Sequence, residues 1–337
     1  MGRPGVQDEF QWADCRHRVV QNEQGFRGPA WGPGRGAAPR LVALGDSFVW
    51  GFGVEEGETF SEVLSRSTGA EVVNAGVSGY GPDQCLLLWK RHAALWTPDR
   101  VAVFVTLAND LDDISSTRRY GYEKPAFVLE DGGSLRLTGV PVPRLDSAAA
   151  GQPSPVRIRQ NRVSRLLARS ALFALTTDAL ARTAWAGPPL EATGFVATGG
   201  ADAAMPLHLR PAPPEVERQW LLLGAILRAL QEDVASRGAR LTVAAIPAAD
   251  EVYDDRWERR VAHHPLDPGV ALDRDEPIRR LAALARAAGA DTIDLLPDLR
   301  AAGRSDRRLY YAVNHHWTVS GHRVVAGVLA SRLGLRR

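Results

Sequence analysis

The chain alternates short, uniformly apolar runs with longer stretches whose apolar residues recur at helical spacing. A short run that is apolar throughout is typical of a strand buried on both faces of a parallel sheet, whereas recurrence every three or four residues indicates a helix. The predicted strands are residues 41–44, 72–73, 101–107, 240–246 and 292–295, and the predicted helices are residues 59–65, 82–96, 214–236, 278–288 and 318–333.

This alternation predicts an α/β protein with three layers, α/β/α, around a central parallel sheet of about five strands joined by right-handed crossovers. Two segments depart from it. Residues 1–40 are rich in Gly, Pro and Arg and show no sustained period, so we expect an irregular N-terminal arm laid over the domain. Residues 119–215 interrupt the remaining domain, residues 41–337, and are predicted to be an insertion.

The insertion is predicted to contain a hairpin and a helix. Short strands at 126–129 and 134–137 flank Asp131-Gly132-Gly133, which is a turn sequence. Residues 162–182 have the pattern of one long helix, and residues 187–214 form a loop rich in Gly, Pro and Ala. Because the insertion follows the third strand, it leaves the carboxyl edge of the sheet, where open α/β folds bind ligands.

Composition narrows the class of protein. The 337 residues are 45% hydrophobic and 24% charged, as in a folded domain with a large core. A net charge of +2, with basic residues dispersed among acidic ones, argues against a nucleic-acid partner. No run reaches the roughly 18 apolar residues of a membrane span, and no signal peptide is visible, so we expect a cytoplasmic protein without a membrane partner. The two isolated cysteines exclude a disulfide framework, and the sequence indicates no oligomeric state.

Two residues have the chemistry of a nucleophile and its base. Ser47, in Gly45-Asp46-Ser47, directly follows the first predicted strand, and His316 lies in the loop before the last helix. In a doubly wound sheet both loops open on the same edge, so the two side chains can meet. A histidine that accepts the hydroxyl proton is the minimum requirement for a serine nucleophile. Taken alone, Ser47 also fits a helix cap and His316 a surface residue.

Two more loops leave the same edge. Gly79 follows the second predicted strand, and Asn109 follows the third. Glycine permits close approach of a backbone N–H, and an Asn amide is a neutral donor, so these groups and the Ser47 N–H could hold an oxyanion. Asp46 and Trp317 adjoin the nucleophile and the base, and we expect them to contribute weakly to substrate binding.

Together these motifs resemble the SGNH, or GDSL-like, hydrolase superfamily. The matching blocks are Gly45-Asp46-Ser47, residues 74–79, Asn109-Asp110 and His316-Trp317, in the same order. The resemblance covers residues 41–337 apart from the insertion. It implies a flavodoxin-like sheet and a serine esterase that forms an acyl-enzyme on a small acylated substrate, with Ser47, Gly79 and Asn109 as the oxyanion hole and with neither a cofactor nor a metal.

One departure from the superfamily pattern concerns the third member of the triad. The superfamily usually places an Asp two or three residues before the histidine, and here those positions are Asn314 and Val313. Such an Asp orients the imidazole and stabilises the imidazolium. Three explanations stay open: the Asn314 carbonyl accepts the imidazole N–H, another carboxylate or carbonyl does so, or hydrolysis is impaired.

The sequence therefore predicts an acyl-ester hydrolase in which Ser47 attacks and His316 acts first as base and then as acid. One alternative is an O-acyltransferase that uses the same pair of residues, because only the acceptor that reaches the acyl-enzyme differs. The other is a ligand-binding protein without turnover, for which the absent Asp is the only argument.

Overall fold

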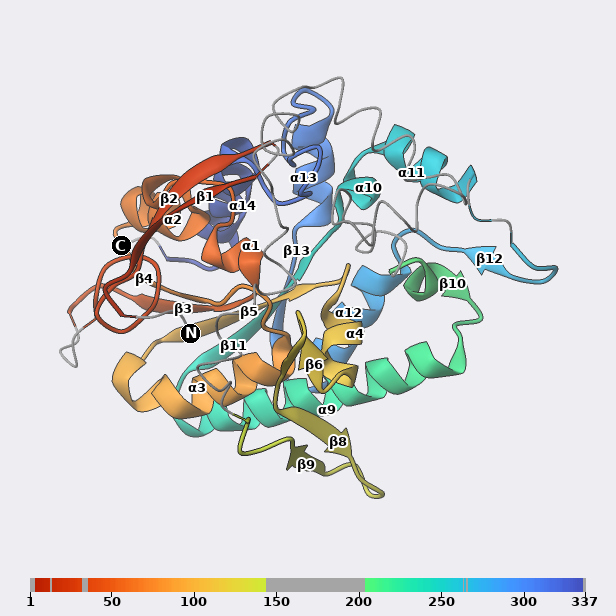
Figure 1. Cartoon of the computed structure of the whole chain (residues 1–337), viewed down its shortest axis with the longest axis horizontal. Coiled ribbons are helices and arrows are strands. Elements are labelled where there is room, and N and C mark those ends of the chain that lie inside the picture. Colours follow the sequence, from red (N-terminus) through yellow and green to blue (C-terminus); the bar gives the residue numbers. More distant parts are fainter. Residues whose placement is uncertain are drawn as a thin grey trace.

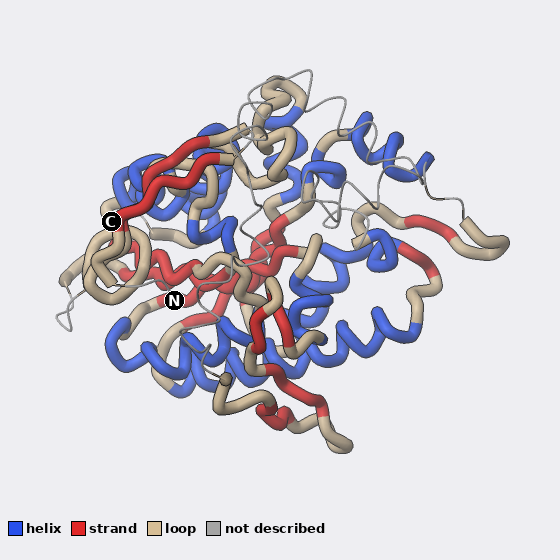
Figure 2. The backbone as a smooth tube through the Cα atoms, viewed as in Figure 1, coloured by secondary structure: helices blue, strands red, loops and turns tan. Residues whose placement is uncertain are grey.

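The structure is a computed structural model that describes residues 4–12, 14–31, 36–143, 204–262, 264 and 266–335. Its centre is a parallel sheet with the strand order β13-β11-β5-β3-β4 (Figures 1 and 2). The strands are β3 (Arg40–Gly45), β4 (Glu71–Gly76), β5 (Arg100–Thr106), β11 (Arg240–Ile246) and β13 (Asp291–Asp294). The predicted α/β/α fold and five-stranded parallel sheet are thereby confirmed, and the predicted strands differ from the observed ones by at most a few residues at each end.

The strands are buried because their side chains are apolar on both faces. In β3 and in all but the first residue of β5 every position is buried, which is the pattern of a central parallel strand. In the register, Val42 lies opposite both Val73 of β4 and Val101 of β5. Leu41 to Leu44 are 0% exposed and form the centre of the core.

Helices cover both faces of the sheet. One face carries α3 (Pro82–Trp96), α9 (Pro214–Ser236) and α12 (Glu276–Ala287), and the other carries α2 (Phe60–Thr68), α13 (Leu296–Gly303) and α14 (Val319–Arg332) (Figure 1). The strand order places the carboxyl ends of β3, β4 and β5 side by side. The loops that leave these ends therefore share one edge of the sheet.

Shorter helices and strands flank the central sheet and its covering helices. They are α1 (Ser47–Trp50), η1 (Glu56–Glu58), α4 (Asp110–Ser115), α10 (Ala249–Val252), α11 (Asp254–Ala262), η2 (Met205–His208), and the paired strands β10 (Leu209–Arg210) and β12 (Ala271–Leu272). In the described part of the chain no helix is both long and apolar enough to cross a membrane. The same residues contain no group of three or more His, Cys, Asp or Glu that could hold a metal ion.

The N-terminal arm is more regular than expected. Strands β1 (Gln7–Gln11) and β2 (Arg16–Val20) form an antiparallel hairpin that lies above α1, α2 and α14 in Figure 1. The prediction of a wholly irregular arm was wrong, because β1 is exposed at every position and so has no apolar alternation to reveal it. Arg27 fixes the arm, since its buried guanidinium donates to the carbonyls of Trp50, Gly51 and Val54.

The start of the predicted insertion is described, and its centre is not. The expected hairpin is present as β8 (Ala126–Leu129) and β9 (Leu135–Thr138), preceded by the two-residue strands β6 (Arg118–Arg119) and β7 (Tyr122–Glu123). The helix predicted at 162–182 and most of the loop predicted at 187–214 lie outside the described residues. The division into arm, domain and insertion stays a prediction.

Candidate active site

Ser47 lies where β3 turns into α1. The strand ends at Gly45, where an added Cβ would meet Val49 Cγ2 at 2.5 Å, so the tight turn requires glycine. Asp46 then caps α1, because its Oδ1 accepts the N–H of Phe48 at 2.9 Å. Ser47 is the first residue of the helix and keeps 9% of its surface exposed. The local sequence thus holds the hydroxyl at the carboxyl edge of the sheet.

His316 meets this serine from the other end of the chain. Its loop leads into α14, which packs against α2, and His322 of α14 accepts the N–H of Phe60 at 3.2 Å. This packing brings His316 Nε2 to 2.8 Å from Ser47 Oγ, although the two residues are 269 positions apart. The rings of Phe48 and Phe52 pack against the His316 imidazole, and each ring centroid lies 4.7 Å from the imidazole centroid.

The aromatic surroundings set the protonation of His316. Burial lowers the pKa of the imidazole from 6.5 to about 4; the hydrogen bond to the Asn314 backbone opposes this shift, and the nearby His315 and His17 add to it. His316 is therefore neutral at pH 7. A neutral imidazole with Nε2 facing a serine hydroxyl is the protonation state that a general base requires.

Asn314 orients the imidazole. The Nδ1 of His316 lies 3.0 Å from the Asn314 main-chain oxygen and 3.2 Å from its Oδ1, and both atoms are acceptors. Nδ1 must therefore carry the proton, which leaves the Nε2 lone pair free for the Ser47 hydroxyl. Asn314 Oδ1 also accepts the His316 backbone N–H at 2.9 Å. The geometry matches the first of the three explanations for the missing Asp, with the main-chain carbonyl as a second acceptor.

The carboxylate of Asp14, in the N-terminal hairpin, contacts Asn314. Asp14 Oδ1 accepts the Asn314 side-chain N–H at 2.7 Å, and Asp14 Oδ2 accepts the backbone N–H groups of Val313 and Asn314 at 2.6 and 3.2 Å. The Cys15 sulfur also lies 3.3 Å from Asn314 Nδ2. Asp14 has no signal in the sequence, because no local motif connects residues 300 positions apart.

Gly79 and Asn109 lie in loops at the same edge, and their surroundings differ. Gly79 has φ +80°, and an added Cβ would meet the ring of Tyr120 at 2.5 Å, so the ring covers this glycine. The Asn109 amide donates to Asp113 Oδ2 at 2.7 Å and to Asp110 Oδ1 at 3.2 Å. Both of its N–H groups are thus engaged within the chain, and donation to an oxyanion requires release of one contact.

Two predicted substrate-binding residues, Asp46 and Trp317, are buried beside the site. Asp46 is 3% exposed and acts as the cap of α1, while Trp317 is 0% exposed and packs on Phe48 with a centroid distance of 5.0 Å. Both side chains are thus largely closed to solvent, and their role in substrate binding stays a prediction. Burial raises the pKa of Asp46 to about 6, and the hydrogen bond from Phe48 opposes that rise.

Cations from the start of the predicted insertion neutralise acids beside this edge. Arg119 forms an ion pair with Asp113, and Lys124 forms one with Asp83. The Lys124 and Asp83 side chains are only 4% and 1% exposed. The segment around β6 and β7 is therefore fastened to α3 and α4, which explains why Tyr120 lies over Gly79.

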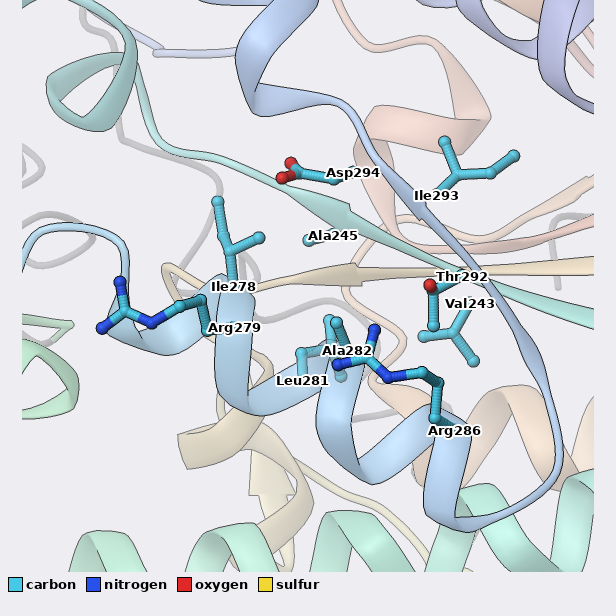
Figure 3. A pocket seen from close by; sticks show the side chains of 10 residues that line it. All are labelled: Val243, Ala245, Ile278, Arg279, Leu281, Ala282, Arg286, Thr292, Ile293 and Asp294. Carbon is cyan, nitrogen blue, oxygen red and sulfur yellow. The ribbon is translucent and has the colours of Figure 1, made fainter.

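A cavity of about 300 Å³ lies apart from these residues. Figure 3 shows its side chains coming from β11, α12 and β13, with Arg279, Arg286 and Asp294 among them. It belongs to the face of the sheet that α12 covers, whereas α14 and the His316 loop belong to the opposite face. None of its lining residues is Ser47, His316, Asn314, Gly79 or Asn109, so the serine site is a separate feature.

Part of the chain matches a known family model. Residues 214–336 match the family model described as the SGNH hydrolase-like domain of the acetyltransferase AlgX. The matched segment includes His316, while Ser47, Gly79 and Asn109 precede it. Over residues 214–336 the chain is therefore similar to the SGNH/GDSL-like superfamily, and its five-stranded parallel sheet flanked by helices fits the fold of that class.

One curated protein is similar to part of the chain. It is 32% identical over 129 residues to the protein named "Probable alginate O-acetylase AlgJ" of Pseudomonas aeruginosa, a match that covers 38% of this chain and 29% of that protein. The matched region is thus less than a third of that relative.

Two solved structures align with most of the chain. A catalytic mutant of Axe2, an acetylxylan esterase from Geobacillus stearothermophilus, has a TM-score of 0.44 and 13% identity over 90% of this chain and 98% of that one. LAE5, an alpha/beta hydrolase from the metagenome of Lake Arreo, has a TM-score of 0.45 and 13% identity over the same shares.

Proposed function

We propose that this protein moves an acyl group through an acyl-enzyme formed on Ser47, and that the acceptor is a hydroxyl group of a carbohydrate. The proposal of an acyl-enzyme rests on the 2.8 Å contact between Ser47 Oγ and His316 Nε2. Asn314 supports it by fixing the proton on His316 Nδ1. The choice of acceptor is supported by the acetyltransferase family model and by the relative named as an alginate O-acetylase.

In the first half of the reaction the Ser47 hydroxyl proton passes to His316 Nε2 as Oγ attacks the carbonyl carbon of a small acylated donor. The carbonyl oxygen becomes an oxyanion, for which the backbone N–H groups of Ser47 and Gly79 are the candidate donors. Asn109 joins them once its longer contact, to Asp110, is released. Collapse of the intermediate expels the alkoxide of the donor, which takes the proton from Nε2.

In the second half an acceptor hydroxyl gives its proton to Nε2 and attacks the acyl carbon, and Ser47 regains its proton as it leaves. Water in the same place gives hydrolysis, which is the second candidate and the outcome that the four motifs favour from the sequence. The ring of Tyr120 lies over Gly79, and in this proposal it limits the access of water to the acyl-enzyme. No step uses a cofactor.

Labelling with a serine-reactive fluorophosphonate tests the nucleophile. We expect the wild-type protein to be labelled and Ser47→Ala to remain unlabelled. Ser236→Ala, which removes an exposed hydroxyl at the end of α9, is the matched control and should label like the wild type. Equal labelling of the wild type and Ser47→Ala would overturn both candidate functions.

Product analysis then separates the two candidates. With p-nitrophenyl acetate as donor, transfer predicts that acetylated saccharide grows at the expense of free acetate as an oligosaccharide acceptor is increased. Free acetate alone at every acceptor concentration would refute transfer and leave hydrolysis.

A further inference from the structure

Asp14 occupies the tip of the N-terminal hairpin, and that tip is directed at the histidine loop. Its two carboxylate oxygens accept three N–H groups, two from Asn314 and one from Val313. The hairpin positions it firmly, because the pair Gln11–Arg16 ends the ladder and the Trp12 N–H donates to the Cys15 carbonyl at 2.8 Å. A carboxylate from the arm is thus built into the loop that precedes His316.

These contacts decide which way the Asn314 amide faces. Its NH₂ group points to Asp14, so its Oδ1 points to His316 and accepts there from both the backbone N–H and Nδ1. The flipped amide would place its oxygen against the carboxylate and its NH₂ against the two N–H donors of His316. Both contacts would be repulsive, and Asp14 therefore selects the orientation that presents an acceptor to the imidazole.

We propose that Asp14 is a positioning residue that acts on His316 through the Asn314 amide and takes over the electrostatic part of the usual triad Asp. This inference depends on the proposed acyl transfer at Ser47. When the Ser47 proton reaches Nε2, positive charge develops on the imidazole and strengthens the bond from Nδ1–H to Asn314 Oδ1. The carboxylate polarises the amide that accepts this bond, and the Nδ1 proton stays in place.

The main-chain oxygen of Asn314, 3.0 Å from Nδ1, fixes the tautomer by itself. The loss of Asp14 should consequently cost less than the loss of a triad acid. A charge-assisted hydrogen bond contributes a rate factor of roughly 10 to 100 when its full effect is felt in the transition state. We expect a decrease in this range in the rate constant of fluorophosphonate labelling at saturation, with little change in the reagent's half-saturation concentration.

The decisive variants exchange the two side chains. Asp14→Asn removes the charge, and Asn314→Asp alone sets two carboxylates face to face. The double exchange, Asp14→Asn with Asn314→Asp, restores a donor opposite an acceptor and puts the carboxylate beside the imidazole. Asp8→Asn is the matched control, because it makes the same chemical change at an exposed position of the same hairpin.

We expect Asp14→Asn to lose about 10- to 100-fold in labelling rate and the exchange to recover to within about threefold of the wild type. Because a carboxylate then adjoins His316, the acidic limb of the pH profile should move to higher pH in the exchange variant. Asp8→Asn should label like the wild type. If the hairpin had only a structural role, the exchange variant would not recover the labelling rate, and the pH at which the rate falls would not change.

Two results would overturn the proposal: a rate for Asp14→Asn within twofold of the wild type, or a loss that the exchange does not recover. If Asp14→Asn does not fold, as judged by circular dichroism, the exchange is compared with Asn314→Asp alone. Equal rates for these two would also overturn it, because only the exchange removes the facing carboxylates. Failure of the proposed function is recognised separately, by equal labelling of the wild type and Ser47→Ala.

Discussion

The protonation of His316 leads to a quantitative prediction for the pH dependence of the nucleophile. The pKa of His316 is lowered from 6.5 to about 4, chiefly because burial penalises the imidazolium. At pH 5.5 a histidine with a pKa of about 4 is roughly 97% neutral, whereas one with the ordinary value is only about 9% neutral. Activation of Ser47 should therefore be about tenfold greater at this pH than an ordinary histidine would allow.

The assay is the fluorophosphonate labelling rate between pH 3.5 and 8. The base must be neutral to accept the serine proton, so the rate is retained above the pKa of His316 and lost as the pH falls through about 4. Asp46 and Asp113 have pKa values raised to about 6 by burial, and their protonation could add a smaller step there. An NMR titration of the His316 imidazole in Ser47→Ala identifies the step that belongs to the base.

A midpoint at or above pH 6 in both the labelling rate and the imidazole titration would refute this reasoning. It would mean that the rings of Phe48 and Phe52 do not exclude water from His316. If the imidazole titrates near pH 4 but the labelling rate changes near pH 6, the change in rate would instead be assigned to the carboxylates of Asp46 and Asp113. In either case the wild-type protein is measured beside Asp8→Asn, whose exposed carboxylate should leave the profile unchanged.

Two other predictions concern the segment around β6 and β7. Tyr120→Ala should raise the ratio of free acetate to acetylated saccharide, because it uncovers Gly79, and its effect on the urea-unfolding midpoint should be small since Tyr120 is 44% exposed. An unchanged ratio would contradict the shielding role of the ring. Lys124→Met should lower the free energy of unfolding in urea by about 3–5 kcal/mol, because it leaves Asp83 buried without its partner. A loss below about 1 kcal/mol would show that Asp83 is not held as an anion.

The sheet could be predicted from the sequence because its strands are buried on both faces. A run such as Val101 to Val105 is apolar at consecutive positions, and this pattern depends only on the local sequence. The same locality explains why Ser47 and His316 were found: each directly follows or precedes a regular element, and the sheet topology brings such positions to one edge. The prediction needed no knowledge of side-chain packing.

The sequence was less informative wherever a side chain's direction mattered. Asp46 and Trp317 adjoin Ser47 and His316, yet the turn after β3 directs Asp46 to a backbone N–H, and Trp317, just before α14, is buried in the core. The engagement of the Asn109 amide by Asp110 and Asp113 was equally hidden, since it depends on the side-chain directions in the first turn of α4. Side-chain directions of this kind are not specified by the pattern of apolar and polar positions along the chain.

In our proposal, the hairpin of the N-terminal arm compensates at a distance for the missing Asp. An Asp at position 314 would contact His316 directly. Its absence from the sequence therefore suggests impaired catalysis. The fold places a carboxylate one hydrogen bond further away, on an arm that Arg27 ties to the loop after α1. Because the same arm contacts the segment after Ser47 and the segment before His316, the geometry of the pair depends on residues at the two ends of the chain. If the proposal holds, the residues next to the histidine are not enough to judge the triad, and the acid should be sought among all groups that bind the neighbour of the imidazole.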